Sequence, residues 1–213
     1  MRFLVCRFWQ GRLSRQYTHR GECMSGACVV TLNPQNTAVA FAVPWWGVIT
    51  VRGRFEQVAG ELIIPNGDLS VASLRLDVEA GSIRTGIGLR DRHLRGPDFL
   101  DARRFPIIRF RSLRMERVNG AIEVAGHLTL RGTEREIAAR VPLGIPEGSG
   151  ADSTVALATY IQVPRLPHQI GLAQGIHRLN PLLHAIGSQV GVSIRLLVPA
   201  ARLLPALLPA LGR

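Results

Sequence analysis

The feature that most constrains this chain is a two-residue alternation of apolar and polar side chains, which recurs in many short segments. The clearest case spans residues 72–80, where Leu74, Leu76 and Val78 alternate with polar or charged side chains. The same period recurs in residues 39–43, 51–55, 122–130, 137–141, 155–163 and 190–198. Such alternation predicts strands with one dry face and one wet face, as in antiparallel sheets.

Turn-forming pairs separate several of these segments. Asn66-Gly67 and Asn119-Gly120 each stand between segments that alternate, and Asn-Gly is the strongest short-range signal for a β-hairpin. About eight such strands can close into a barrel, which removes both exposed sheet edges. The residues alone therefore predict an all-β domain, either a barrel or a sandwich.

Two segments do not alternate. Residues 86–104 are rich in charge, and we expect a short helix and a loop that lie over one end of the sheet structure. Residues 164–188 contain three prolines and three histidines, and we expect a long loop with one helical turn near residues 182–186.

The ends of the chain carry its excess charge. The net charge is +11, all 26 basic residues are arginine, and residues 153–213 contain five arginines without any acid. A basic and apolar end suits an anionic membrane surface. Nucleic acid is not an expected partner, because the tail has few aromatic side chains on which bases could stack.

The domain boundaries follow from these shifts in composition. We expect a basic N-terminal extension over residues 1–28, a β domain over residues 29–198 and an apolar, basic tail over residues 199–213. Met24 is an alternative start, which would make residues 1–23 a non-native extension. No secretory signal is evident, and the three cysteines form neither a disulfide framework nor a zinc pattern. The expected location is the cytoplasm, with membrane association left open.

Several motifs resemble the YceI-like family, in the order and at about the spacing of that family. They are residues 51–55 (VRGRF), 82–86 (SIRTG), 90–95 (RDRHLR), 98–101 (DFLD), 105–112 (FPIIRFRS) and 126–132 (GHLTLRG). The resemblance implies a single antiparallel eight-stranded barrel, similar to lipocalins, that encloses a polyisoprenoid lipid. It implies a carrier or storage protein for isoprenoid quinones or prenyl phosphates, with no cofactor besides the lipid. Residues 165–172 (RLPHQIGL) depart from the family pattern.

A barrel of this size either encloses one slim ligand or is filled by its own side chains. Small inward residues such as Gly53 and Gly126 favour a cavity, whereas large neighbours such as Phe41 and Phe110 could fill it. With the resemblance we expect a cavity. The expected apolar lining is Phe41, Val43, Trp45, Phe55, Leu74, Leu76, Leu94, Phe99, Phe110, Val124, Leu128, Ile137, Leu157 and Ile161. The expected head-group site at the mouth is Arg90, Asp91, His93 and His168.

Other functions remain as alternatives. Asp91 and His93 could act as an acid–base pair on a bound amphiphile, but neighbouring arginines and acids favour ion pairs that fix the segment. His168, together with His177 and His184, matches no zinc spacing, so no metal is expected. A module that docks on a membrane or a partner through its basic ends is the third interpretation. A homodimer is compatible with the apolar tail.

Overall fold

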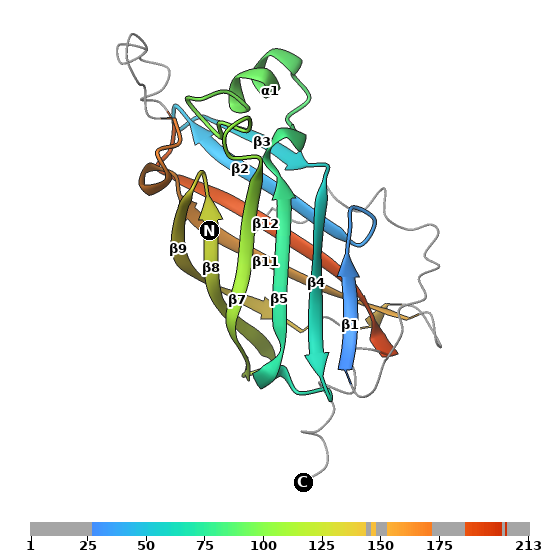
Figure 1. Cartoon of the computed structure of the whole chain (residues 1–213). Coiled ribbons are helices and arrows are strands. Elements are labelled where there is room, and N and C mark those ends of the chain that lie inside the picture. Colours follow the sequence, from blue (N-terminus) through green and yellow to red (C-terminus); the bar gives the residue numbers. More distant parts are fainter. Residues whose placement is uncertain (1–26, 144–145, 148–152, 172–185, 202, 204–213) are drawn as a thin grey trace.

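Two antiparallel six-stranded sheets make up the fold in the computed structural model, which describes residues 27–143, 146–147, 153–171, 186–201 and 203 (Figure 1). The first sheet contains, in spatial order, β1 (Ala27–Leu32), β4 (Val58–Pro65), β5 (Ser73–Glu79), β7 (Ile107–Val118), β8 (Ala121–Leu130) and β9 (Thr133–Pro142). The second contains β10 (Pro146–Glu147), β11 (Thr154–Pro164), β12 (Gln189–Pro199), β2 (Thr37–Trp45), β3 (Ile49–Phe55) and β6 (Ile83–Arg84). The all-β prediction is confirmed.

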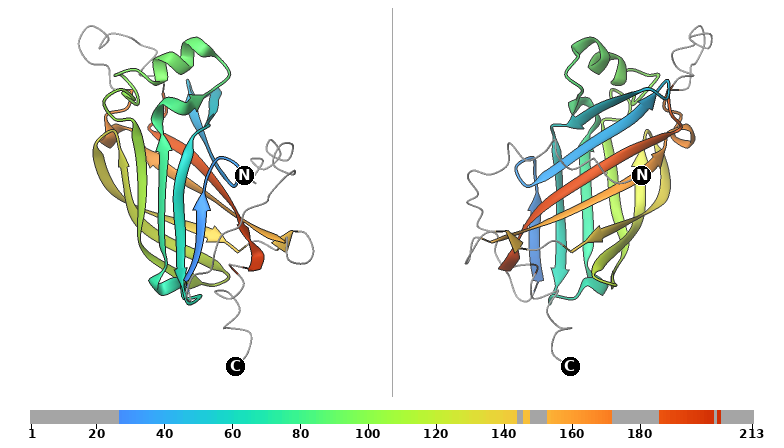
Figure 2. Two further views of the ribbon diagram at one scale, coloured as in Figure 1. Left: turned by 45° about the vertical axis from the view of Figure 1, so that its right-hand side comes forward. Right: turned by 180° about the vertical axis from the view of Figure 1, so that it is seen from behind.

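The predicted closure into one eight-stranded barrel is not observed. The strands of the second sheet run obliquely across those of the first (Figure 2), and no ladder joins the sheets within the described residues. Strands β9 and β11 lie side by side, and the Thr159 hydroxyl on β11 donates a 2.9 Å hydrogen bond to the carbonyl of Arg140 on β9. This oblique packing makes an open structure of two facing layers.

The tight turn predicted at Asn119-Gly120 is confirmed by its backbone, and a second turn of the same kind joins β8 to β9. Asn119 and Gly120 join β7 to β8 with φ values of 48° and 73°, and Arg131 and Gly132 join β8 to β9 with 50° and 70°. Positive φ at both central residues gives the turn the twist that a two-residue hairpin requires. Strand β8 thereby pairs with both of its neighbours over nearly its whole length, with one register shift on β7 between Ser112 and Arg114.

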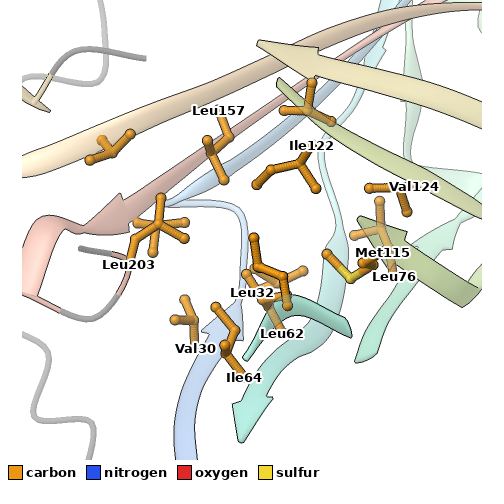
Figure 3. Packing of buried hydrophobic residues seen from close by; sticks show 14 of the residues in the cluster. Val30, Leu32, Leu62, Ile64, Leu76, Met115, Ile122, Val124, Leu157 and Leu203 are labelled. Atoms are coloured by element: carbon orange, nitrogen blue, oxygen red, sulfur yellow. The ribbon is translucent and has the colours of Figure 1, made fainter. Parts of the chain in front are cut away.

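A dense hydrophobic cluster closes the end of the molecule that lies opposite helix α1 (Gly88–Leu94) (Figure 3). Its most buried members come from both sheets, and Leu32, Ile64, Val155, Val198 and Leu203 are at most 1% exposed. Side chains that are buried this completely pack closely and leave few voids between them. We call this cluster the plug, since it fills the space between the sheets at that end; its members nearest α1, such as Leu76 and Val124, also border the space beyond it.

At the other end, the short helix and loop predicted over residues 86–104 are confirmed as part of a segment that spans residues 80–106. They begin with the 3-10 turn η2 (Ala80–Ser82) and β6, continue through α1, and lie over the upper end of the sheets (Figure 1). Two arginines hold this segment in place. Arg95 donates to the Ile83 carbonyl in β6, which pairs with β3, and Arg131 at the β8–β9 turn donates to the Pro97 carbonyl. The segment is therefore a fixed cover at the edge of the interior.

Several predicted features lie outside the described residues. They are the extension over residues 1–26 with its alternative start at Met24, the helical turn near residues 182–186 except Ile186, and most of the tail. His177 and His184 also lie outside the described residues.

Candidate functional site

A cavity of about 750 Å³ lies between the two sheets, on the α1 side of the plug. Pockets that hold small molecules are typically about 300–1,000 Å³ in volume and are mostly apolar. This one is walled by the inward faces of β2, β3, β5, β7, β8, β9, β11 and β12, together with residues of α1 and the loops near it. It is large enough, and dry enough, to hold an extended hydrocarbon.

The apolar residues predicted to line a cavity nearly all lie on its wall. They are Phe41, Val43, Trp45, Phe55, Leu74, Leu76, Leu94, Phe99, Phe110, Val124, Leu128, Ile137 and Ile161. The prediction for Leu157 is wrong. Its side chain is 4% exposed and packs in the plug, because it lies nearer the closed end of β11 than Ile161 does.

The large aromatic side chains do not fill the interior, because glycines make room for them at the wall. A Cβ on Gly53 would lie 2.5 Å from Cζ of Phe41, and one on Gly126 would lie 2.7 Å from Cζ of Phe110. Each ring therefore lies over a glycine of a neighbouring strand, and the middle of the cavity stays open. The structure therefore favours the cavity over an interior filled by its own side chains, since the rings occupy only the space above the glycines.

Some wall residues were missing from the sequence-based set. Val190, Val192, Ile194 and Leu196 of β12 line the cavity with period two. The alternation of residues 190–198 was a sufficient signal for them. Nothing in the sequence indicated Ile186, which reaches the wall through an isolated bridge to Trp45.

Few polar side chains reach the cavity wall, and none of them is acidic within the described residues. They are Arg90 and His93 on α1, Thr159 on β11, and Arg165 just after β11. Arg90 donates to the hydroxyl and the carbonyl of Thr85, at 2.8 and 3.0 Å. Hydrogen-bond donors and positive charge thus meet the cavity at the end where α1 lies.

Arg165 is buried, with 7% of its surface exposed, and its guanidinium is surrounded by backbone carbonyls. Nε donates to Gly187, Nη1 to Ile170 and, at 3.4 Å, to Gly171, and Nη2 to Ile186. Burial lowers the pKa of Arg165 from its usual value, but an arginine remains protonated at neutral pH. The side chain joins two loops to the end of β11.

Asp91 does not lie at the mouth as predicted. Its side chain is buried, and Oδ1 accepts hydrogen bonds from the backbone N–H and the hydroxyl of Thr85, at 2.8 and 2.5 Å. His93 does line the cavity, with its ring against Phe99 and Nε2 3.8 Å from a carboxylate oxygen of Asp98. Asp91 therefore anchors the start of α1. The ring of His93, in contrast, faces the cavity and lies beside Phe99 and Asp98.

His168 was also predicted at the mouth, and the structure places it elsewhere. It lies in the 3-10 turn η4 (Leu166–His168), is 1% exposed, and its Nδ1 is 3.2 Å from the Leu130 carbonyl. Burial is the main cause that lowers the pKa of His168. The imidazole is thus neutral at pH 7, and it fixes η4 against the end of β8.

The part of the chain that the structure describes contains no group of three His, Cys, Asp or Glu side chains that could hold a metal ion. None of its helices has the length and apolar character needed to span a bilayer.

The cavity reaches solvent beside α1. Ile87 and Leu89 both line the cavity and are exposed, at 53% and 76% of their surface. The plug closes the opposite end, so this opening is the route that the geometry offers to a ligand.

Comparison with known sequences identifies relatives of this chain. The model of the YceI-like domain matches residues 30–197. A UPF0312 protein of Vibrio cholerae is 29% identical over 110 residues, which cover 51% of this chain and 58% of that protein. A UPF0312 protein of Pseudomonas aeruginosa is 24% identical over 123 residues, covering 58% and 64%. The match to the Vibrio relative thus spans little more than half of its length.

Solved structures share the fold at low sequence identity. BcnA of Burkholderia cenocepacia superposes with a TM-score of 0.64 at 16% identity, covering 76% of this chain and 96% of that one. A polyisoprenoid binding domain from Saccharophagus degradans, implicated in plant cell wall breakdown, gives 0.57 at 12% identity, covering 82% and 98%. At these identities the similarity establishes the fold.

Proposed function

The chain belongs to the family of YceI-like domains, and on that premise we propose that it binds a long-chain isoprenoid lipid between its sheets. The observation that carries the proposal is the 750 Å³ cavity, whose wall is almost entirely hydrocarbon. A structural neighbour from Saccharophagus degradans is described as a polyisoprenoid binding domain, which supports this class of ligand.

The energetics of such a cavity favour a carrier or storage role. Burying each methylene away from water contributes about 0.8 kcal/mol, so an isoprenoid chain would strongly prefer the cavity to solution. A bilayer offers the same chain a comparably dry environment, and the net transfer free energy between the two is therefore small. A small difference permits both loading and release.

The polar side chains at the wall indicate the character of the head group. Arg90 and His93 can donate hydrogen bonds there, and the described wall contains no carboxylate. We therefore propose a head group that accepts hydrogen bonds, either the carbonyls of a quinone or the oxygens of a phosphate. A cationic head group would meet repulsion at this end.

We propose binding without catalysis. The acid–base alternative required Asp91 and His93 to act together on a ligand, but the carboxylate of Asp91 is buried and accepts two hydrogen bonds from Thr85. A general base must be within reach of the proton that it abstracts. The described geometry gives Asp91 a structural partner instead.

Native mass spectrometry and solvent extraction of the purified chain test the proposal. We expect a co-purified isoprenoid, which Ala139→Phe should exclude because Ala139 lines the cavity. Ala138→Phe is the matched control, since Ala138 immediately precedes Ala139 in β9 and is exposed on the outer face. A wild-type protein that neither carries nor takes up an isoprenoid, or two variants that lose lipid equally, would refute the proposal.

A further inference from the structure

Exposed large apolar side chains gather at the open end of the cavity. Trp46, Val48 and Ile49 lie in and beside the β2–β3 turn, and Ile87 and Leu89 lie at the start of α1. Val48 is 88% exposed and Leu89 is 76% exposed. We call these five residues the mouth rim.

The two parts of the mouth rim lie at the same end of the molecule. Figure 1 and Figure 2 both show the β2–β3 turn and α1 at the upper end, away from the plug. Trp45, next to the turn, and Leu89 on α1 line the same cavity. The rim therefore borders the opening through which a ligand would pass.

Single exposed apolar side chains are common and carry no meaning. Here five occur in two short segments, and the turn also holds Trp46 at a φ of 55°. A bulky residue with positive φ is rare because its side chain crowds the backbone. The fold thus keeps an indole exposed at some conformational cost, next to two exposed aliphatic side chains.

Unpaired positive charge accompanies the rim. Arg52 on β3 and Arg92 on α1 are exposed, and neither is paired with a carboxylate within the described residues. The acid of α1, Asp91, is buried and bonded to Thr85. An apolar surface flanked by arginines complements the interface of an anionic bilayer, where indoles are enriched and basic side chains are attracted.

We propose that the mouth rim docks on the surface of an anionic lipid bilayer. Val48, Ile49 and Leu89 enter the boundary between head groups and acyl chains, while Arg52 and Arg92 bind lipid phosphates. The opening of the cavity then faces the acyl chains, so that a lipid can pass without crossing water. This docking goes beyond the proposed lipid binding, and it does not require a loaded cavity.

Vesicle co-sedimentation of the full chain tests the inference, with phosphatidylcholine vesicles that contain or lack phosphatidylglycerol and contain no isoprenoid. We expect the Val48→Asp/Ile49→Asp variant to lower the partition coefficient at least about tenfold. The matched control is Val71→Asp/Leu113→Asp, which adds the same charge at positions 60% and 62% exposed and away from the rim. The control should change partitioning less than about threefold.

A second variant separates the electrostatic contribution. Arg52→Ser should weaken binding about fivefold on anionic vesicles and leave binding to neutral vesicles unchanged, because one arginine near such a surface contributes about 1 kcal/mol. Both aspartate variants should keep any co-purified isoprenoid, since none of the four substituted residues lines the cavity. Failure of lipid binding in the wild type would thus leave the docking result interpretable.

Equal effects of the rim and control variants, or no effect of either, would overturn the inference. So would sedimentation velocity that shows a dimer dissociated by the rim substitutions while vesicle binding persists. In that case the rim would be a contact between two copies of the chain.

Discussion

Replacing Arg165 with methionine should reveal how the loops beside the cavity are held. The guanidinium donates hydrogen bonds of 2.8, 2.8 and 2.9 Å to the carbonyls of Gly187, Ile170 and Ile186. Methionine is unbranched and apolar and reaches about as far as the aliphatic stem of arginine, so it keeps the packing of that stem and removes every donor. The two loops would then have no common partner at the end of β11.

The size of the effect follows from two opposing contributions. Each hydrogen bond to a charged group stabilises by about 1.5–3 kcal/mol, and each carbonyl left buried without a donor costs about 1–3 kcal/mol. Against this, methionine avoids the desolvation of a buried charge, which costs several kcal/mol. Ile170, Ile186 and Gly187 are only half-buried, so water can reach some of the released carbonyls. We expect a net loss of about 2–4 kcal/mol.

Chemical denaturation measures this loss, and amide hydrogen exchange locates it. The free energy of unfolding should fall in Arg165→Met and fall less in Arg165→Lys, which keeps a charge with fewer donors. Exchange should accelerate at the amides of Gly171 and Gly187, which donate to the Asp98 and Pro44 carbonyls. Arg103→Met, at an exposed position, should change stability by less than about 0.5 kcal/mol. A loss below about 1 kcal/mol would contradict the expected magnitude, and a gain would show that desolvation outweighs the hydrogen bonds.

Two further predictions address the residues first assigned to the mouth. Because burial lowers the pKa of His168 in the folded chain, the unfolded chain gains a proton first as pH falls below about 6.5. The free energy of unfolding should therefore decline below that pH by up to about 1.4 kcal/mol per pH unit. Urea titrations of His168→Asn should show a shallower decline with pH. Equal declines in the variant and the wild type would contradict the reasoning. Asp91→Ala should destabilise by about 1.5–3 kcal/mol and speed amide exchange at Thr85, because the Thr85 donors lose their acceptor. Unchanged exchange would contradict an anchoring role for Asp91.

Alternation in the sequence predicted most of the long strands because each has one face turned inward. Residues 72–80 contain β5, in which Leu76 and Val78 are buried and Arg75 is exposed. Strand β7 escaped this reasoning because of a β-bulge between Ser112 and Arg114. Before the bulge the inward residues include Phe110, and after it Met115 is inward, so the parity changes within one strand. A bulge depends on the pairing with β8, which a single strand does not encode.

Alternation also fails to predict which inward residues of a strand pack in the plug and which line the cavity. Leu157 and Ile161 belong to the same face of β11, yet one packs in the plug and the other lines the cavity. The two positions are equivalent in period and similar in chemistry. Their roles differ because β11 crosses the first sheet obliquely, so each position meets a different part of the opposite layer (Figure 2). Only the packing of the two sheets decides that.

The division of the interior determines how a ligand can exchange. At the plug, Ile64, Val198 and Leu203 are fully buried, and passage there would require the best-packed part of the molecule to open. At the other end the wall continues to Ile87 and Leu89, which already meet solvent. Local opening costs less where few apolar contacts are lost, so exchange at the α1 end leaves the plug intact. The best-packed part of the interior and the opening beside α1 thus lie at opposite ends of the same pair of sheets.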